Sequence, residues 1–205
     1  MSVFFTADTH FCHTNVIKHC NRPYGSIEEH DEALINNWNS MVGRNDIVYV
    51  IGDFAWKNHN RFISALKGRK ILILGSHDKM GKDVLKNFTE VHPVRTVSIN
   101  GNPIWLQHCC PRVWEKCHYG VPCFFGHSHG RLRTFNLSFD VGVDCWEYKP
   151  VSWETMAVLI KDRTAEMELA GRIVKENGKT LYRQDDVRWL MDRQGLSSPS
   201  ENLCD

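Results

Sequence analysis

The sequence lacks the long apolar runs and the charge excess that would assign it to a membrane or to nucleic acid. No apolar stretch approaches the roughly 20 residues that a transmembrane helix needs. The first ten residues, MSVFFTADTH, contain neither a basic segment nor a long apolar one, so we expect no secretory signal. The formal net charge is only +1 over 205 residues, which gives no overall field for a polyanion. These absences favour a cytoplasmic protein without a membrane partner, and nucleic acid would need a local basic patch.

Closely spaced cysteine pairs are also missing. The chain contains 8 cysteines, yet none forms a C-x-x-C pair, even in the cluster between residues 109 and 123. Without an export signal, cysteines are usually reduced thiols. We therefore expect small buried side chains there rather than disulfides or a structural zinc site.

The composition supports one good hydrophobic core. Hydrophobic residues make up 42% of the chain and aromatic residues 11%, which suits one domain with a modest appendage. Periodicity weakens after residue 170, so we predict a domain over residues 1–170 and a C-terminal extension over 171–205. The extension is predicted to hold a short helix at 185–193 and a flexible tail.

Short apolar strands in the first half run directly into polar residues. Residues 3–6 precede Asp8 and His10, and residues 46–51 precede Asp53. Between them, Ser26 begins a capping box, and apolar residues follow at helical spacing. This pattern predicts a helix that joins two parallel strands.

A third strand in this half has the same ending. A helix over 58–66 leads into the apolar run at 71–74, which ends in Ser76, His77 and Asp78. In open α/β sheets, ligands gather at the carboxyl ends of the strands. The three strand ends are therefore expected to share one site.

The second half changes to a hairpin pattern. Residues 97–99 and 104–106 flank Asn-Gly, which favours a hairpin turn, and the second strand runs out into His108. A strand at 122–125 ends in His127 and His129, and another is predicted at 137–143. A helix over 152–161 closes this half, so the expected fold class is mixed α/β.

The polar residues at the strand ends form a metal-binding pattern. Imidazole together with carboxylate suits Mn, Fe, Zn or Co, whereas Mg or Ca would prefer oxygen throughout. The candidates outnumber the ligands of one ion, which points to two metals about 3.5 to 4 Å apart that share a carboxylate, an arrangement suited to attack on a phosphate.

The order of these motifs resembles that of the calcineurin-like metallophosphoesterase superfamily. D-x-H, G-D, G-x-H-D, a single His and G-H-x-H follow one another over about residues 3 to 160. The stretches DTHFCHTNVI, DEALINNWNSMV and DIVYVIGDFA further resemble small bacterial and phage-type phosphoesterases. The resemblance implies a four-layer αββα sandwich of two mixed β-sheets flanked by helices, with a dinuclear site at the strand ends.

The resemblance also implies a role for each motif residue. A hydroxide between the metals would attack phosphorus, and the expected ions are Mn²⁺, with Fe, Zn, Co or Ni as alternatives. The carried-over roles are as follows: Asp8, His10 and His129 hold the first metal; Asp53 bridges; His108, His127 and the residue at position 76 hold the second; His77 assists the departing oxygen; and Asp78 orients the loop or His77 as a further catalytic candidate.

Ser76 departs from the superfamily pattern. The usual residue there is Asn, whose amide oxygen binds the second metal, whereas Ser offers a hydroxyl on a shorter stem. The hydroxyl would reach the metal weakly, through a water, or not at all. We therefore expect a weaker second site and an unchanged first site.

Residues near the predicted ligand loops could select the substrate. Arginine offers a planar fork for phosphate, and tryptophan can stack on a base. The alternative for the arginines is ordinary surface charge. The candidate substrate-binding residues are Arg22, His13, Asn15, Arg112, Trp114 and Arg131.

Three functions stay open at this point. The first is a metal-dependent phosphodiesterase or phosphatase that acts on a nucleotide or a similar small phosphoester. The second is a nuclease that acts on nucleic-acid ends, which the near-neutral charge disfavours. The third is a phosphoesterase-like scaffold with weakened catalysis, which Ser76 alone supports. The sequence leaves the oligomeric state open.

Overall fold

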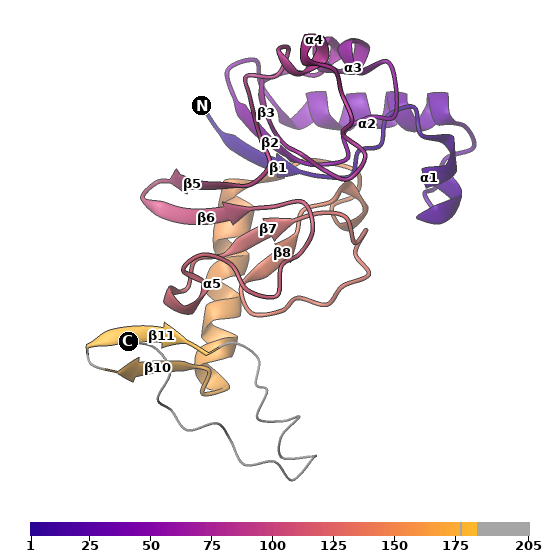
Figure 1. Cartoon of the computed structure of the whole chain (residues 1–205). Helices are drawn as coiled ribbons and strands as arrows, with labels where there is room; N and C mark the ends of the chain where they lie inside the picture. Colours follow the sequence, from indigo (N-terminus) through magenta and orange to yellow (C-terminus); the bar gives the residue numbers. More distant parts are fainter. Residues whose placement is uncertain (177, 184–205) are drawn as a thin grey trace.

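The computed structural model describes residues 1–176 and 178–183, which contain two large sheets flanked by helices (Figure 1). The first sheet has the strand order β4-β3-β2-β1-β9. Its first four strands in the chain run parallel, and β9 pairs antiparallel with β1. The strands are β1 (Val3–Thr6), β2 (Ile47–Ile51), β3 (Arg69–Ile73), β4 (Glu90–His92) and β9 (Val151–Ser152).

The second sheet has the order β5-β6-β7-β8. It begins with the predicted hairpin, whose two turn residues, Asn100 and Gly101, both have positive φ (51° and 81°), as the turn that matches strand twist requires. The remaining pairs are parallel. The strands are β5 (Arg95–Ile99), β6 (Asn102–Leu106), β7 (Cys123–Phe125) and β8 (Ser138–Asp140).

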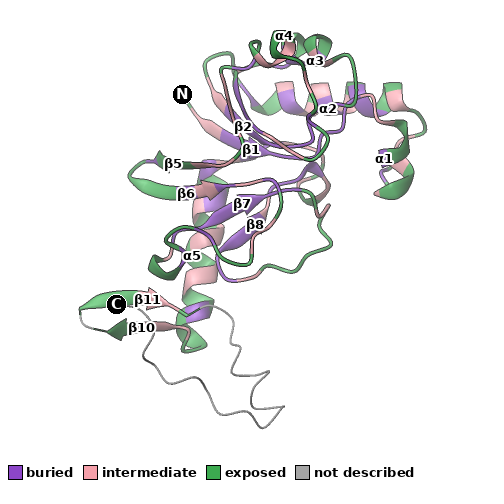
Figure 2. Ribbon diagram, in the orientation of Figure 1, coloured by how far each residue is buried: buried purple, intermediate pink, exposed green. Residues whose placement is uncertain are grey.

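Alternation along the strands of the first sheet divides the core in two. Phe5 faces the second sheet, where its ring meets Phe124 edge-on at 4.7 Å. Its neighbour Phe4 points to the opposite face and packs in the core that contains Leu34 and Trp38 of α2. The buried strands therefore lie between exposed helical surfaces, as Figure 2 shows.

Helices cover the outer side of the first sheet and flank the second (Figure 1). On the first sheet lie α2 (Ile27–Met41), α3 (His59–Ala65) and α4 (Lys82–Leu85), and α5 (Trp153–Leu169) flanks the second. Ser26 and Ser152 cap α2 and α5 by accepting hydrogen bonds from backbone N–H groups. The predicted sandwich of two mixed sheets with flanking helices is confirmed.

Several elements differ from the sequence prediction, which did not include α4, β4 and β9. A short α1 (Thr14–His19) follows the first motif, and α5 continues to Leu169 because Met167 is still buried in the central core. The strand expected at 137–143 ends at Asp140, whose carboxylate accepts from Gly142 N and turns the chain into a 3-10 helix at Val143–Cys145.

A hairpin of β10 (Ile173–Glu176) and β11 (Lys179–Tyr182) follows Gly171, where no strand was predicted. The predicted helix at 185–193 and the tail lie outside the described residues, so that part of the prediction stays open. Over the residues that the structure describes, no helix is both long and apolar enough to cross a membrane.

Candidate metal centre

The site lies where the parallel strands β1, β2 and β3 end at one edge of the first sheet. Backbone hydrogen bonds tie the first two motif loops together, from Asp8 N to Gly52 O at 3.0 Å and from His10 N to Asp53 O at 3.0 Å. The second sheet closes the site from the other side, since His127 N donates to Asp8 Oδ2 at 2.8 Å. Motifs from both sheets are thereby held at one place.

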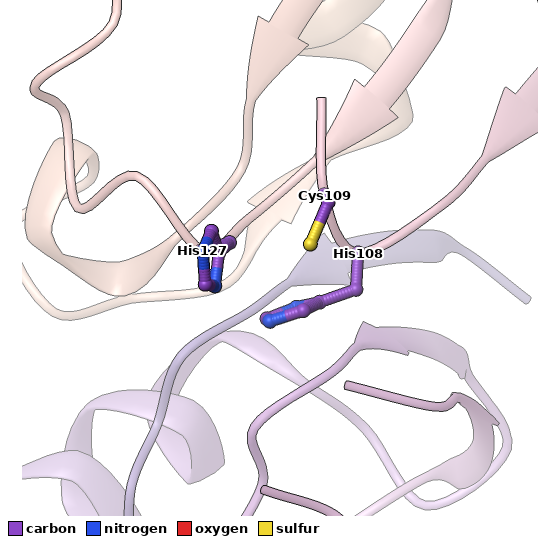
Figure 3. A group of neighbouring side chains, drawn as sticks. All are labelled: His108, Cys109 and His127. Atoms are coloured by element: carbon purple, nitrogen blue, oxygen red, sulfur yellow. The ribbon is translucent and has the colours of Figure 1, made fainter. Parts of the chain in front are cut away.

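Two groups of potential ligands meet at this place. The donor atoms of Asp8, His10 and His129 all lie within 4.8 Å of one another; we call these residues the inner group. Those of His108, Cys109 and His127 do the same; these residues form the outer group, which Figure 3 shows. Five of the predicted ligands lie in these two groups, and Cys109 joins them without having been predicted. Ser76 is in neither group, and metal binding by all these residues stays a prediction.

Asp53 stands between the two groups. Its Oδ2 lies 3.6 Å from His10 Nε2 and 3.3 Å from His108 Nε2. Its Oδ1 accepts a hydrogen bond from His77 N at 2.8 Å, which fixes the carboxylate. One carboxylate oxygen thus faces an imidazole of each group, which is the position that a bridging ligand needs.

Hydrogen bonds set the orientation of two candidate histidines. His108 Nδ1 donates to Ile51 O at 2.9 Å, so in the neutral ring Nε2 carries the lone pair and faces the centre. His129 Nδ1 lies 2.7 Å from Asp144 Oδ2. Histidines that bind metals usually hydrogen-bond a carbonyl or carboxylate through the other ring nitrogen, so both are oriented as metal ligands would be.

Buried polar atoms without hydrogen-bond partners mark where a cation fits. Among the described residues, Asp8 Oδ1 and His108 Nε2 are buried and have none. An unsatisfied buried polar group costs roughly 1 to 3 kcal/mol, and more when it is charged. A divalent ion bound by these atoms would remove that cost, so the residues present fit the metals that the superfamily resemblance implies.

The pKa values of the two buried aspartates are displaced in opposite directions by burial and by the neighbouring imidazoles. Burial raises the pKa of Asp8 to about 7, although His108 and His129 act in the opposite direction. Burial also acts to raise the pKa of Asp53, but His108, the backbone N–H of His77 and His10 outweigh it and hold that pKa well below its usual range. A bound cation would stabilise both carboxylates.

The pKa values of the facing imidazoles are displaced in opposite directions. Burial lowers the pKa of His10 to about 3. For His108 burial acts the same way, but the carboxylate of Asp53, 3.3 Å from Nε2, outweighs it and raises the pKa to about 9. Perturbed titratable groups gathered at strand ends are typical of functional sites.

The backbone at the candidate ligands is strained. Positive φ angles are uncommon in non-glycine residues and persist only where the surroundings enforce them, often at active sites. Because the candidate ligands carry such angles on three separate strand-end loops, the strain accompanies the site and not one turn. The residues and angles are Asp8 (56°), His10 (50°), Asp53 (54°), His127 (68°) and His129 (49°).

Two glycines in the motifs allow the close approach of the site loops. A Cβ at Gly52, which has φ +87°, would lie 2.2 Å from His108 Nδ1. A Cβ at Gly126 would lie 2.6 Å from Asp8 Oδ2. Glycine before each motif is thus required by packing around the ligands.

Asp78 is a clamp for the loops and not a group that faces a substrate. It is buried, and its carboxylate accepts from the backbone N–H groups of Asp53, Phe54 and Gly75 at 2.8 to 2.9 Å. The expectation that it orients the loop fits this geometry. A direct catalytic role does not, because its oxygens are occupied by backbone donors.

Two aspartates of the site were not identified from the sequence. Asp144 accepts from His129 and from Arg22, and Asp140 accepts from Ser128 Oγ at 2.6 Å and Gly130 N at 3.0 Å. They thereby fix the loop that carries the last motif. The available signal was their place in D-V-G-V-D, after an apolar strand like those that precede the other motifs.

Arg22 does not bind substrate as predicted, because it is 4% exposed and its guanidinium is used internally. It donates to Asp8 O at 2.7 Å and to both oxygens of Asp144 at 2.8 and 2.7 Å, and it contacts His30. These bonds place it behind the inner group. It stabilises the loop of the first motif and the carboxylate that orients His129.

Trp114 is likewise misassigned by the sequence. Its Nε1 donates to Val121 O at 2.6 Å, and its ring is buried with Cys117 and Cys123 in a small separate cluster. A ring packed in this way cannot stack on a base. The prediction failed because the sequence gives no sign of which tryptophans the surrounding loop covers.

The other candidate residues lie at the surface. Ser76 is exposed, and its role as a metal ligand stays a prediction. Asn15 and Arg112 are exposed, and Arg131 is exposed with a hydrogen bond to His19 O. Contact of these three residues with a substrate stays a prediction. His77 is also exposed, and its ring centroid lies 5.8 Å from that of His10, so it borders the inner group with its side chain accessible.

An aromatic wall that the sequence did not reveal stands beside His77. Trp56 is 52% exposed and stacks on His13, with ring centroids 4.7 Å apart and an interplanar angle of 11°. Its centroid lies 5.6 Å from that of His77. His13 is therefore at the site, where it supports an exposed indole.

Comparison with known proteins finds relatives in an archaeon and in mycobacteriophages. No protein-family model matches the sequence. The chain is 32% identical over 171 residues to the uncharacterized protein MJ1445 of Methanocaldococcus jannaschii, covering 78% of this chain and 91% of the relative. It is 34% identical over 181 residues to the gene 66 protein of Mycobacterium phage D29, covering 71% and 89%.

A solved structure shares the fold. The protein of unknown function AQ665 from Aquifex aeolicus superposes with a TM-score of 0.62 at 24% identity, covering 77% of this chain and 98% of that one. Given the identity and coverage of the relatives above, the chain belongs to the family that contains MJ1445 and the phage gene 66 protein.

Proposed function

We propose that this member of the family is a dinuclear metal-dependent phosphoesterase of the calcineurin-like superfamily. The observation that carries the proposal is the position of Asp53 Oδ2, 3.6 Å from His10 Nε2 and 3.3 Å from His108 Nε2, beside buried atoms of Asp8 and His108 that have no partner. Two ligand groups that share one carboxylate suit a pair of ions about 3.5 to 4 Å apart.

The inner group and Asp53 would hold one ion, and the outer group with Asp53 the other. When bound, such ions supply an activated water and positive charge that stabilises a phosphoryl group under attack. Mn²⁺ remains the expected ion, with Fe, Zn, Co or Ni as alternatives, because the donors are imidazole and carboxylate. The chain's own contribution is to fix these donors before a substrate arrives.

His77 is assigned to the departing oxygen. Its backbone N–H is held by Asp53 Oδ1, while its side chain is exposed beside the inner group. An imidazole in this place can donate a proton to a leaving alkoxide. Nothing in this role requires His77 to bind a metal.

The aromatic wall of His13 and Trp56 supports a substrate with a planar group. The exposed indole offers a flat apolar surface next to His77, and stacking on an aromatic side chain is worth roughly 1 to 3 kcal/mol per base. A nucleotide or a similar small phosphoester fits such a surface. The absence of a long basic stripe in the sequence continues to disfavour a nuclease.

The test is metal analysis combined with a substrate screen. The protein would be loaded with Mn²⁺ and assayed on phosphomonoesters and phosphodiesters, nucleotides included. We expect hydrolysis by the wild type and by Asp83→Asn, an exposed carboxylate that serves as the matched control, and its loss in Asp53→Asn. A folded, metal-loaded wild type without activity on any of these esters would contradict the proposal.

A further inference from the structure

Cys109 lies in the outer group with its sulfur beside two histidine rings. Its Sγ and one ring nitrogen of each of His108 and His127 all lie within 4.8 Å of one another, and in Figure 3 the three side chains converge on one space. Ligands of a tetrahedral zinc site lie about 3.5 Å apart, given bond lengths of about 2.0 to 2.3 Å. A modest closure of these three side chains would therefore enclose an ion.

An independent observation on His108 points to a ligand at the same place. Its side chain is 4% exposed, and its Nε2 is buried without a hydrogen-bond partner. Because Nδ1 donates to Ile51 O, Nε2 offers a lone pair toward the outer group. The atom 3.3 Å away is Asp53 Oδ2, a fourth donor at the separation that ligands of one ion have.

We propose that Cys109 is a thiolate ligand of the metal held by the outer group. On binding, the S–H bond of Cys109 breaks, its proton passes to solvent, and a metal–sulfur bond forms. The completed set is then one sulfur, two imidazole nitrogens and the shared carboxylate of Asp53. This assignment rests on the proposed function only in that both require a metal at the outer group.

The thiolate changes which ion the outer group prefers. Thiolate ligands favour Zn²⁺ and other soft or borderline ions, whereas sites of imidazole and carboxylate also accept Mn²⁺. The inner group has no sulfur among its members Asp8, His10 and His129. The two halves of the centre should therefore differ in metal preference, with Zn²⁺ or Co²⁺ held more firmly by the outer group.

The experiment is Co²⁺ titration of the full-length protein under anaerobic conditions, read by absorption. A cobalt–thiolate bond gives a sulfur-to-metal charge-transfer band in the near ultraviolet that nitrogen and oxygen ligands do not give. The proteins compared are wild type, Cys109→Ser and Cys110→Ser. Cys110 is the matched control because it is the adjacent cysteine, and its Sγ contacts Pro111 O.

We expect the band in wild type and Cys110→Ser and its loss in Cys109→Ser, with about a 10- to 100-fold weaker second Co²⁺ equivalent in Cys109→Ser, a range typical even of losing a group that supports a ligand. The same band in all three proteins, or its absence from all three, would overturn the assignment. Hydrolysis plays no part in this readout, so a failed phosphoesterase proposal leaves a positive spectral result standing.

A second measurement avoids mutation altogether. Cys109 is exposed, so an alkylating reagent can reach it in the metal-free protein. We expect Zn²⁺ to protect Cys109 from alkylation, as read by peptide mass spectrometry, and to leave the labelling of Cys12, which belongs to none of the ligand groups of the described residues, unchanged. Equal labelling of Cys109 with and without Zn²⁺ would contradict thiolate ligation.

Discussion

The inner and outer ligand groups differ in how deeply their side chains are buried. Asp8 and His10 of the inner group are 0% and 5% exposed, and Arg22 and Asp144 support that group from behind. In the outer group only His108 is buried, while Cys109 and His127 are exposed. Burial fixes ligand geometry before a metal arrives, whereas exposure leaves room for a substrate. The comparison suggests that the inner group holds its metal in a fixed geometry and that the outer group leaves space for the substrate.

Removal of the shared carboxylate should break both groups at once. Asp53→Asn removes a charge from the position between His10 and His108, so we expect loss of metal from both sites and a larger loss of activity than the 10- to 100-fold typical of a supporting residue. Elemental analysis after dialysis measures the metal. Full metal content in a folded Asp53→Asn protein would show that the groups do not share this residue.

Replacement of His77 should leave both groups intact and reduce turnover. For His77→Ala we expect kcat to fall by roughly 10² to 10⁴, as for loss of a general acid, with unchanged metal content. The effect should shrink on p-nitrophenyl esters, whose leaving group needs little protonation. Loss of metal would make His77 a ligand, and equal losses on good and poor leaving groups would argue against proton donation.

The members of the inner group could be predicted from the sequence, whereas Arg22 and Asp144, which support that group from behind, could not. Short apolar strands that end in Asp or His are visible as local patterns, and parallel strands bring their ends together. The partners of Arg22 are not visible in this way, since Asp144 lies 122 residues away along the chain. The burial of Trp114 and the exposure of Trp56 likewise depend on long-range packing, which no local pattern encodes.

Cys109 illustrates the same limit within the outer group. The sequence predicts a small buried side chain without a role in metal binding, because no C-x-x-C spacing accompanies it. The structure instead places it at the surface, and it meets His127 only because β6 and β7 pair in parallel and bring their carboxyl ends together. Ligand sets formed by pairing of distant strands have no short sequence signature.

Truncation of the aromatic wall should affect substrate binding and neither ligand group. For Trp56→Ala we expect KM for a nucleotide substrate to rise about 5- to 150-fold, which corresponds to the 1 to 3 kcal/mol of one stacked base. KM for an ester without an aromatic group should stay the same, and Trp56→Phe should retain most of the nucleotide affinity. A uniform loss on both substrate types would assign Trp56 a structural role.

Removal of the support behind the inner group should weaken that group alone. Asp144→Asn removes the carboxylate that orients His129, so we expect metal affinity at the inner group to fall about 10- to 100-fold. The cobalt–thiolate band of the outer group should persist. Equal weakening of both metal equivalents in a calorimetric titration would contradict the separation of the two groups.

The pair formed by Asp144 and His129 should make the stability of the metal-free protein depend on pH. Burial acts to raise the pKa of Asp144, but His129 and Arg22 outweigh it and lower that pKa to about 2. Burial acts to lower the pKa of His129, but Asp144 outweighs it and raises that pKa to about 10. Relative to unfolded values of about 3.9 and 6.5, the Asp144 contribution is lost as pH falls through about 2, and the His129 contribution as pH rises through about 10.

The advantage of wild type over Asp144→Asn in thermal unfolding should therefore be largest between about pH 4 and 6.5, the window that the unfolded pKa values set. Toward pH 10 it should shrink without vanishing, because Arg22 still binds Asp144. A difference that does not change with pH would show that the charges of this pair do not contribute.

The smallest effect is expected at Ser76. If Cys109 completes the outer group, the amide that the superfamily pattern leads one to expect at this position is not required, and Ser76→Asn should change the half-saturating metal concentration by less than the 10-fold that marks loss of a supporting group. A metal titration of activity for both proteins measures it. Marked tightening in Ser76→Asn would support a weakened outer site instead, and with it a smaller role for Cys109.

Anomalous diffraction from crystals soaked in Mn²⁺ and Zn²⁺ tests the central claim most directly. Data collected on either side of the zinc edge locate each ion and identify it. The account predicts two ions about 3.5 to 4 Å apart, one among Asp8, His10, His129 and Asp53, and a zinc among Asp53, His108, His127 and the sulfur of Cys109. A single ion, or two ions with no ligand in common, would contradict the claim that Asp53 joins two unlike halves of one centre.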